Sequence, residues 1–186
     1  MDHMITDIHL LTQDLLACCD DPQTGLPQEI FNLVSQLTPL VNVDLLIRDA
    51  SGQTLLTWRE DKHYGPGWHI PGGIVRFKET FATRIAKVAD SELGCTVEFD
   101  PKPLTVHELF RPQGDIRGHF ISFLHNCRLT SAPAERLKFH GGVPSKEHCG
   151  QWQWFRHCPE LIAVHEKIYR SIIETPCLKA SLPEHS

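Results

Sequence analysis

A pair of glycines followed by an amphipathic segment with a glycine stop is the feature that most constrains this chain. In residues 69–95, HIPGGIVRFKETFATRIAKVADSELGC, apolar side chains recur at helical spacing. They are Phe81, Ile85, Val88 and Ala89. This spacing predicts a helix from about Glu79 to Leu93, ended by Gly94, because glycine readily takes the left-handed conformation that closes a helix. Glu92 then lies in the last turn, where the exposed carbonyls repel a carboxylate, and something must offset that repulsion.

Periodic segments on both sides of this helix indicate a sheet. Strands are predicted at 40–48, 54–60, 103–110, 119–129 and 151–155. In the first of them an apolar face alternates, formed by Val41, Val43, Leu45 and Ile47. Further helices are predicted at 26–37 and 159–174. The buried stripe expected for the last helix is Leu161, Ile162, Val164, Ile168 and Ile172. This order of elements predicts an α/β fold with a mixed β-sheet sandwiched between α-helices.

The length of 186 residues suits one domain with a substantial core. We assign residues 26–175 to that domain and residues 176–186 to a C-terminal tail. Residues 1–25 form an N-terminal extension, either as a short helix or without regular structure. No internal repeat divides the chain further.

Composition excludes several classes of partner. The net charge is −5 and basic residues do not cluster, so neither nucleic acid nor an anionic membrane is an expected partner. No apolar run approaches the roughly 20 residues that a membrane span needs. The seven cysteines are odd in number and lack CxxC spacing, which favours reduced thiols and a cytoplasmic location. We do not expect a zinc site at the pairs His148-Cys149 and His157-Cys158, because adjacent residues on a strand point to opposite faces and each pair would offer one ligand at most.

The glycine–helix segment resembles the Nudix box, G-x5-E-x7-R-E-U-x-E-E-x-G-U, where U is aliphatic. The positions that fall in register are Gly73, Glu79, Lys87, Glu92 and Gly94. Two positions that hold acids in the common box are Val88 and Ser91 here. The common box uses its acids to hold several divalent ions. With two of these acids replaced, the box of this chain lacks the ligands to do so.

One branch of the family, the GDP-mannose mannosyl hydrolases, also lacks these two acids. Its box is G-x5-E-x7-R-L-T-x-A-E-L-G, and this chain has KVADSELG at the position of the last eight residues. The likeness extends over about residues 26–170. It includes LPQEIFNLVSQLTPLVNVDLLI, LLTWRE, GPGWHIPGG and KEHCGQWQWF. The resemblance implies a Nudix fold and hydrolysis of a nucleoside diphosphate sugar. We also expect a homodimer.

The resemblance implies one metal site for Mg²⁺, or for Mn²⁺ in its place. Its protein ligands would be the Gly72 carbonyl, Glu92 and Glu147, where the branch usually has a glutamine at the last position. Mg²⁺ prefers oxygen ligands and keeps positions for substrate phosphate. Such an ion would offset the charge of Glu92 at the helix end.

The chemistry implied by the branch is attack of water on the anomeric carbon of the sugar, with the nucleoside diphosphate leaving. His148 aligns with the general base, and an imidazole suits that role near neutral pH. Arg59 would neutralise charge on the departing diphosphate. Asp44 interrupts an apolar strand, so we expect it to hold an arginine or a sugar hydroxyl.

Substrate contacts are expected at Lys87, Arg76 and Phe120. Each differs from the branch: Lys87 and Phe120 replace an arginine and a tyrosine, and Arg76 lies two residues after Ile74, which stands where the branch has an arginine. These differences indicate a related nucleotide sugar as strongly as GDP-mannose. Two alternatives remain at this point. One is an ordinary Nudix pyrophosphohydrolase that cleaves a P–O bond, and the other is a non-catalytic nucleotide-sugar sensor.

Overall fold

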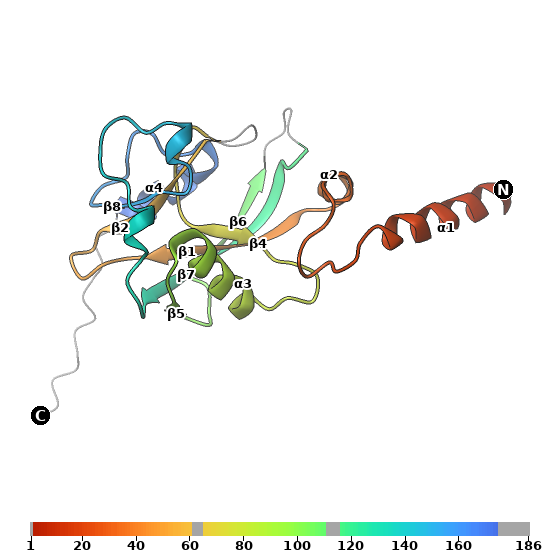
Figure 1. Cartoon of the computed structure of the whole chain (residues 1–186), viewed down its shortest axis with the longest axis horizontal. Helices are drawn as coiled ribbons and strands as arrows, with labels where there is room; N and C mark the ends of the chain where they lie inside the picture. Colours follow the sequence, from red (N-terminus) through yellow and green to blue (C-terminus); the bar gives the residue numbers. More distant parts are fainter. Residues whose placement is uncertain (1, 61–64, 111–115, 175–186) are drawn as a thin grey trace, which may run out of the picture.

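The strands form two sheets in the computed structural model (Figure 1). The structure describes residues 2–60, 65–110 and 116–174, with the backbone alone at 2–6 and 164–166. The five-stranded sheet has the order β4-β1-β7-β5, and β6 also pairs with β7. Its strands are β4 (Gly72–Ile74), β1 (Leu40–Ile47), β7 (His119–Leu129), β5 (Val97–Phe99) and β6 (Thr105–Phe110). The pair β1–β7 is parallel and the other pairs are antiparallel, so the sheet is mixed.

A smaller antiparallel sheet has the order β3-β2-β8. Its strands are β3 (Gly67–His69), β2 (Thr54–Arg59) and β8 (Trp152–Phe155). The α-helices are α1 (Asp2–Ala17), α2 (Gln28–Leu37), α3 (Phe81–Val88) and α4 (Arg170–Glu174). A π-helix, η1 (Ala89–Leu93), continues α3, and 3₁₀ turns are η2 (Glu135–Leu137), η3 (Lys146–His148) and η4 (Val164–Tyr169). The predicted mixed α/β fold is confirmed.

The core consists of two apolar clusters, and β1 supplies side chains to both. Alternate residues of β1 join the first cluster together with the predicted stripe of α3: Val43, Leu45 and Ile47. Leu46 points the other way, into a second cluster with Leu56 and Trp58. Truncating a side chain as buried as Leu45 to alanine costs about 2–5 kcal/mol. Burial on both faces holds β1 in place and, with it, Asp44. Val41 is 38% exposed, so the predicted apolar face begins only at Val43.

The predicted glycine-stopped helix spans the expected residues, but its last turn is wider than an α-helical turn. Thr80 caps the start, because its side-chain oxygen accepts a hydrogen bond from the Thr83 N–H at 3.1 Å. The segment is α-helical to Val88 and then becomes the π-helix η1. Gly94 ends it in the left-handed conformation, with φ 61°. The π turn contains Glu92, and such turns are frequent at functional sites.

The prediction of a single helix over 159–174 is wrong in its first part. Residues 161–163 run beside β3 instead: the Trp68 N–H donates to the Leu161 carbonyl at 2.7 Å, and the Ala163 N–H donates to the Trp68 carbonyl at 2.8 Å. Gly67 permits this approach, because a Cβ there would lie 2.5 Å from the Ala163 nitrogen. Helical structure starts only at η4. Of the predicted stripe, two residues are largely exposed, Leu161 and Ile168, and two reach the core, Ile162 and Ile172. The side chain of Val164 lies outside the described part.

The two ends of the chain were predicted to lie outside the domain. The N-terminal extension is helical, and α1 extends away from the two sheets (Figure 1). The C-terminal tail predicted at 176–186 lies outside the described residues. Within the described part of the chain, no helix combines the length and apolar character that crossing a membrane requires.

Candidate active site

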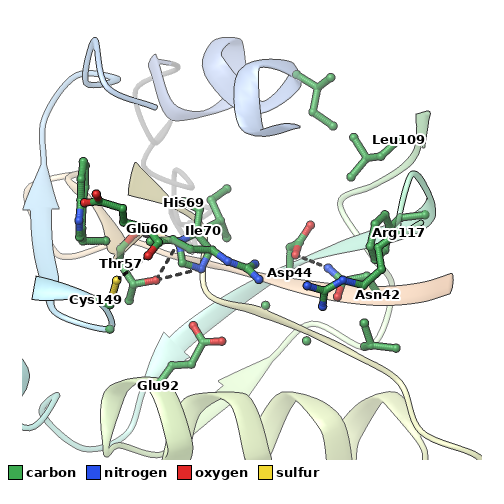
Figure 2. Close-up of a pocket in the computed structure, with 18 of the residues that line it drawn as sticks. Asn42, Asp44, Thr57, Glu60, His69, Ile70, Glu92, Leu109, Arg117 and Cys149 are labelled. Atoms are coloured by element: carbon green, nitrogen blue, oxygen red, sulfur yellow. Dashed lines mark hydrogen bonds between the residues drawn. The ribbon is translucent and has the colours of Figure 1, made fainter. Parts of the chain in front are cut away.

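A cavity of about 670 Å³ opens beside both sheets, and half of the predicted site residues line it (Figure 2). This volume lies within the range of 300–1,000 Å³ that is typical of small-molecule sites. The predicted site residues that line it are Asp44, Arg59, Gly72, Gly73, Glu92 and Phe120. They come from β1, β2, β4, η1 and β7, so chain segments distant in sequence converge here.

Glu92 is the one acid of the π turn that lines the cavity; the other acid of the turn, Asp90, is exposed. Figure 2 shows the Glu92 side chain reaching from the helix toward the cavity. Burial raises the pKa of Glu92 to about 8, and the negative charge of Asp44 raises it further, while Arg59 and a hydrogen bond from the Gly72 backbone act in the opposite direction. A partly buried acid whose pKa is raised further by a second acid is in an environment that a cation would relieve.

Three protein side chains donate hydrogen bonds to the Asp44 carboxylate. Its Oδ2 accepts hydrogen bonds from the Tyr169 hydroxyl, at 2.7 Å, and from the Ser122 hydroxyl, and its Oδ1 accepts from the Asn42 amide. Burial raises the pKa of Asp44, and these three hydrogen bonds lower it. The described partners are therefore hydroxyls and an amide of the protein, and not the arginine considered from the sequence.

The glycines at the start of β4 bring the backbone close to both acids. Gly72 is the register partner of Asp44, and a Cβ on Gly72 would lie 2.2 Å from Asp44 Oδ1. A Cβ on Gly73 would lie 2.8 Å from Val88 Cγ2. Val88 thus fills the space behind the glycine pair with a buried apolar side chain, at a position where the common box has an acid.

Glu79 and Arg76 precede α3, Lys87 lies in its last turn, and none of the three lines the cavity. Glu79 Oε2 accepts from the Arg76 backbone N–H at 2.9 Å and from Arg84 Nε at 2.7 Å, and Glu79 Oε1 lies 3.0 Å from Lys87 Nζ. These contacts join the loop after β4 to the helix, and Gly94 ends the same helical segment. Lys87 and Arg76, predicted as substrate contacts, thus lie outside the cavity lining in this conformation.

The predicted metal ligand Glu147 and the predicted general base His148 belong to η3, beside the cavity. Glu147 is exposed, and neither residue lines the cavity, although Cys149 and Gly150 do. The loop is fixed to the end of β2, since the Gly150 N–H donates to the Trp58 carbonyl at 2.9 Å. His148 Nδ1 accepts from the Ser145 N–H at 3.0 Å, which places the hydrogen of the neutral imidazole on Nε2.

The polar cavity residues that the sequence did not indicate include Asn42, His69 and Arg117. His69 Nδ1 lies 2.9 Å from the Thr57 carbonyl, which can only accept, so Nε2 is the acceptor nitrogen of the neutral ring. The Arg117 guanidinium lies over the Phe31 ring at 5.6 Å, and Figure 2 shows it turned toward Asn42. Asn42 has a sequence signal, a polar residue two before Asp44 on the same strand face; the other two have none.

Two of the predicted acids, Asp44 and Glu92, line the cavity, where a divalent ion could be held. Among the described residues no group of three or more His, Cys, Asp or Glu side chains is placed to hold an ion. The Glu92 carboxylate, with its raised pKa and its position beside Asp44, is the acid best suited to a cation. An ion held there would take its remaining ligands from backbone oxygen, water and a bound diphosphate.

Comparison with known proteins gives consistent results. The NUDIX domain family model matches residues 38–172. The low-salt glycan biosynthesis protein Agl8 of Haloferax volcanii is 36% identical over 99 residues, which cover 53% of this chain and 62% of that protein, so the match spans less than two thirds of the relative.

Two solved structures show the likeness of fold. One is a MutT NUDIX hydrolase from Burkholderia pseudomallei, with a TM-score of 0.52 at 18% identity, covering 74% of this chain and 96% of that chain. The other is an ADP-ribose pyrophosphatase from Streptococcus suis, with a TM-score of 0.50 at 20% identity, covering 80% of this chain and 96% of that chain.

Proposed function

The chain belongs to the NUDIX domain family of hydrolases, and from this premise we propose that it hydrolyses a nucleoside diphosphate sugar to the nucleoside diphosphate and the free sugar. Members of the family act on nucleoside diphosphate derivatives. In the proposed reaction, water attacks the anomeric carbon and the C–O bond to the diphosphate breaks. GDP-mannose or a related GDP-hexose is the proposed substrate.

The proposal rests on one observation: Glu92 is the single acid of the π turn η1 that lines the cavity. Val88 is buried in the core and Ser91 is exposed, so Glu92 supplies the only carboxylate of this turn that lines the cavity. Attack at phosphorus with several ions needs ligands to clamp both the attacking and the leaving oxygen. Attack at carbon needs mainly stabilisation of the departing diphosphate, for which one ion and an arginine suffice.

The leaving group would be stabilised from the Glu92 side of the cavity. Glu92 would hold one Mg²⁺ or Mn²⁺ together with the Gly72 carbonyl, and a bound ion supplies positive charge for the diphosphate oxygens. Glu147 would complete this ligand set only after a movement of η3, because it is exposed and outside the cavity lining in this conformation. Arg59 lies close enough to Glu92 to lower its pKa and lines the same cavity, so its guanidinium would contact the same diphosphate. Positive charge that is already in place requires no reorganisation during the reaction, and it therefore stabilises a departing anion effectively.

The proton of the attacking water would be taken by His148. The loop that carries it is fixed next to Arg59, because the neighbouring Cys149 Sγ donates to the Glu60 carbonyl at 3.3 Å. In this conformation Nδ1 accepts from Ser145, so transfer of a proton to that nitrogen requires this bond to open. Asp44 would accept a hydrogen bond from a sugar hydroxyl, and Phe120 would contact the substrate at the same wall.

A role with sugars agrees with the Haloferax volcanii relative, whose name places it in glycan biosynthesis. Because the match covers only 62% of that protein, it supports a sugar-containing substrate without identifying the base or the sugar.

A screen of GDP-, ADP-, UDP- and dTDP-sugars with Mg²⁺ tests the proposal when both products are identified. The proposal predicts nucleoside diphosphate and free sugar from at least one GDP-hexose, and none in the presence of EDTA. Glu98→Gln, at an exposed position outside the cavity, is the matched control for Glu92→Gln and should leave turnover unchanged. Formation of nucleoside monophosphate and sugar phosphate instead would establish an ordinary pyrophosphohydrolase.

A further inference from the structure

A row of polar side chains crosses the five-stranded sheet beneath the cavity. In the strand registers Asn42 of β1 is opposite Ser122 of β7, and Ser122 is opposite His107 of β6. Asp44 lies two residues after Asn42 and therefore on the same face of β1. Asp44 and Ser122 are 4% and 0% exposed, so this is a buried polar network and not a surface patch.

Tyr169 covers this row from the C-terminal segment. Its ring is fully buried and meets the His107 ring edge to face, with 5.3 Å between centroids. Its hydroxyl lies 2.7 Å from Asp44 Oδ2 and 3.2 Å from Ser122 Oγ. The contact joins residues 125 positions apart, so it ties the last helical segment to the floor of the cavity.

The hydrogen bonds distinguish the two oxygens of Asp44. A carboxylate has about four acceptor positions, two on each oxygen. Tyr169 and Ser122 both donate to Oδ2, whereas Asn42 is the donor to Oδ1 within the described part of the chain. Oδ1 is also the oxygen beside Gly72, where a Cβ would come within 2.2 Å. The carboxylate is therefore fixed through Oδ2, while Oδ1 faces Asn42 and Gly72, two residues that line the cavity.

We propose that Tyr169 is a positioning residue that holds the Asp44 carboxylate so that Oδ1 accepts a hydrogen bond from a sugar hydroxyl of the substrate. The role of Asp44 rests on the proposed function. Tyr169 does not touch the substrate; it acts through Asp44, with Ser122 as the second donor to the same oxygen. This makes the segment 164–174 part of the site, although it contributes no reacting group.

Tyr169→Phe tests the proposal, because it keeps the ring against His107 and removes the hydroxyl. We expect kcat to fall by about 10- to 100-fold, the range usual for residues that orient a functional group. KM and inhibition by the nucleoside diphosphate alone should change less than about threefold, since the diphosphate is bound at the Arg59 and Glu92 side. Ser122→Ala should act in the same direction.

Ser35→Ala is the matched control. It also removes a buried hydroxyl, which donates to the Phe31 carbonyl at 2.7 Å, but it lies in α2 outside the cavity. It should lower the melting temperature without changing kcat. A kcat for Tyr169→Phe within about twofold of wild type, or an equal loss of kcat in Ser35→Ala, would refute the proposal.

A double-mutant cycle shows whether Tyr169 acts through Asp44. In the Asp44→Asn background, Tyr169→Phe should cause no further loss, because the group that it positions is already replaced. Independent losses that multiply would contradict the proposal. Products of the wild-type reaction decide the substrate class separately: if the enzyme cleaves a P–O bond, the same cycle is measured on that substrate, and the two proposals fail or stand independently.

Discussion

Glu92→Gln should make the protein without metal more stable while it removes activity. Burial raises the pKa of Glu92 to about 8 from its ordinary value of 4.5, so the folded protein favours the neutral acid. Above pH 4.5 the unfolded chain carries a carboxylate that the folded site accommodates poorly. Glutamine is neutral at every pH and keeps an oxygen that can accept from the Gly72 backbone, so it avoids this cost.

The size of this change in stability follows from the difference between the pKa of Glu92 in the folded protein and its pKa in the unfolded chain. Because the folded pKa is raised, stability is lost as pH rises from about 4.5 and the loss is complete at about pH 8. One pKa unit corresponds to about 1.4 kcal/mol, so the cost is about 3 kcal/mol at pH 7 and about 5 kcal/mol above pH 8. These values are ceilings, because water entering the cavity lowers the cost of the buried charge.

Urea denaturation in EDTA at pH 5 and pH 8 measures this difference. The free energies of unfolding of Glu92→Gln and wild type should nearly agree at pH 5, and the variant should exceed wild type by several kcal/mol at pH 8. Mg²⁺ should stabilise the wild type and not the variant, since a ligand that binds only the folded state shifts the equilibrium toward it. A variant less stable than wild type at pH 8, or a difference independent of pH, would refute the reasoning.

Other substitutions separate the roles of the remaining residues. Glu79→Gln weakens the contacts to Arg84 and Lys87, so the free energy of unfolding measured in urea should fall by about 1–3 kcal/mol. Steady-state kinetics should show a smaller fall in kcat than for Glu92→Gln. Equal losses of kcat in the two variants would contradict this division of roles. Mn²⁺ titration in the presence of a nucleoside diphosphate, followed by electron paramagnetic resonance, should give one ion per active site, and two or three ions would contradict the single-metal site. His148→Gln should retain Mn²⁺ and lower kcat by about 10²–10⁴-fold; unchanged turnover would exclude His148 as the proton acceptor.

Local patterns in the sequence predict most of the fold. The α3 stripe and the alternation from Val43 to Ile47 report burial directly, and the Gly94 stop reports a left-handed backbone conformation; the structure confirms all three. The 159–163 segment has an equally helical apolar pattern, yet Gly67 allows it to hydrogen-bond to β3 instead. The widening of the helix at Ala89–Leu93 likewise has no signal in apolar spacing. Contacts between distant segments decided both outcomes.

The candidate site is predictable where its residues lie in one motif and not where the fold brings them together. Gly72, Gly73 and Glu92 are recognisable from a single stretch, and they line the cavity. Asp44 stands out as an acid within an apolar strand. Its partners Ser122 and Tyr169 are 78 and 125 residues away, and neither residue type is unusual in its own segment. Their part in the site follows only from strand register and from the return of the C-terminal segment to the sheet.

Hydrolysis in ¹⁸O-labelled water is the most direct test of the central claim, because it identifies the bond that breaks. The products of a GDP-hexose, or of whichever nucleotide sugar the enzyme accepts, are analysed by mass spectrometry after a single turnover. Attack at the anomeric carbon predicts that the label appears in the free sugar and that the nucleoside diphosphate is unlabelled. Label in a nucleoside monophosphate or a sugar phosphate would show attack at phosphorus and would contradict the proposed mechanism.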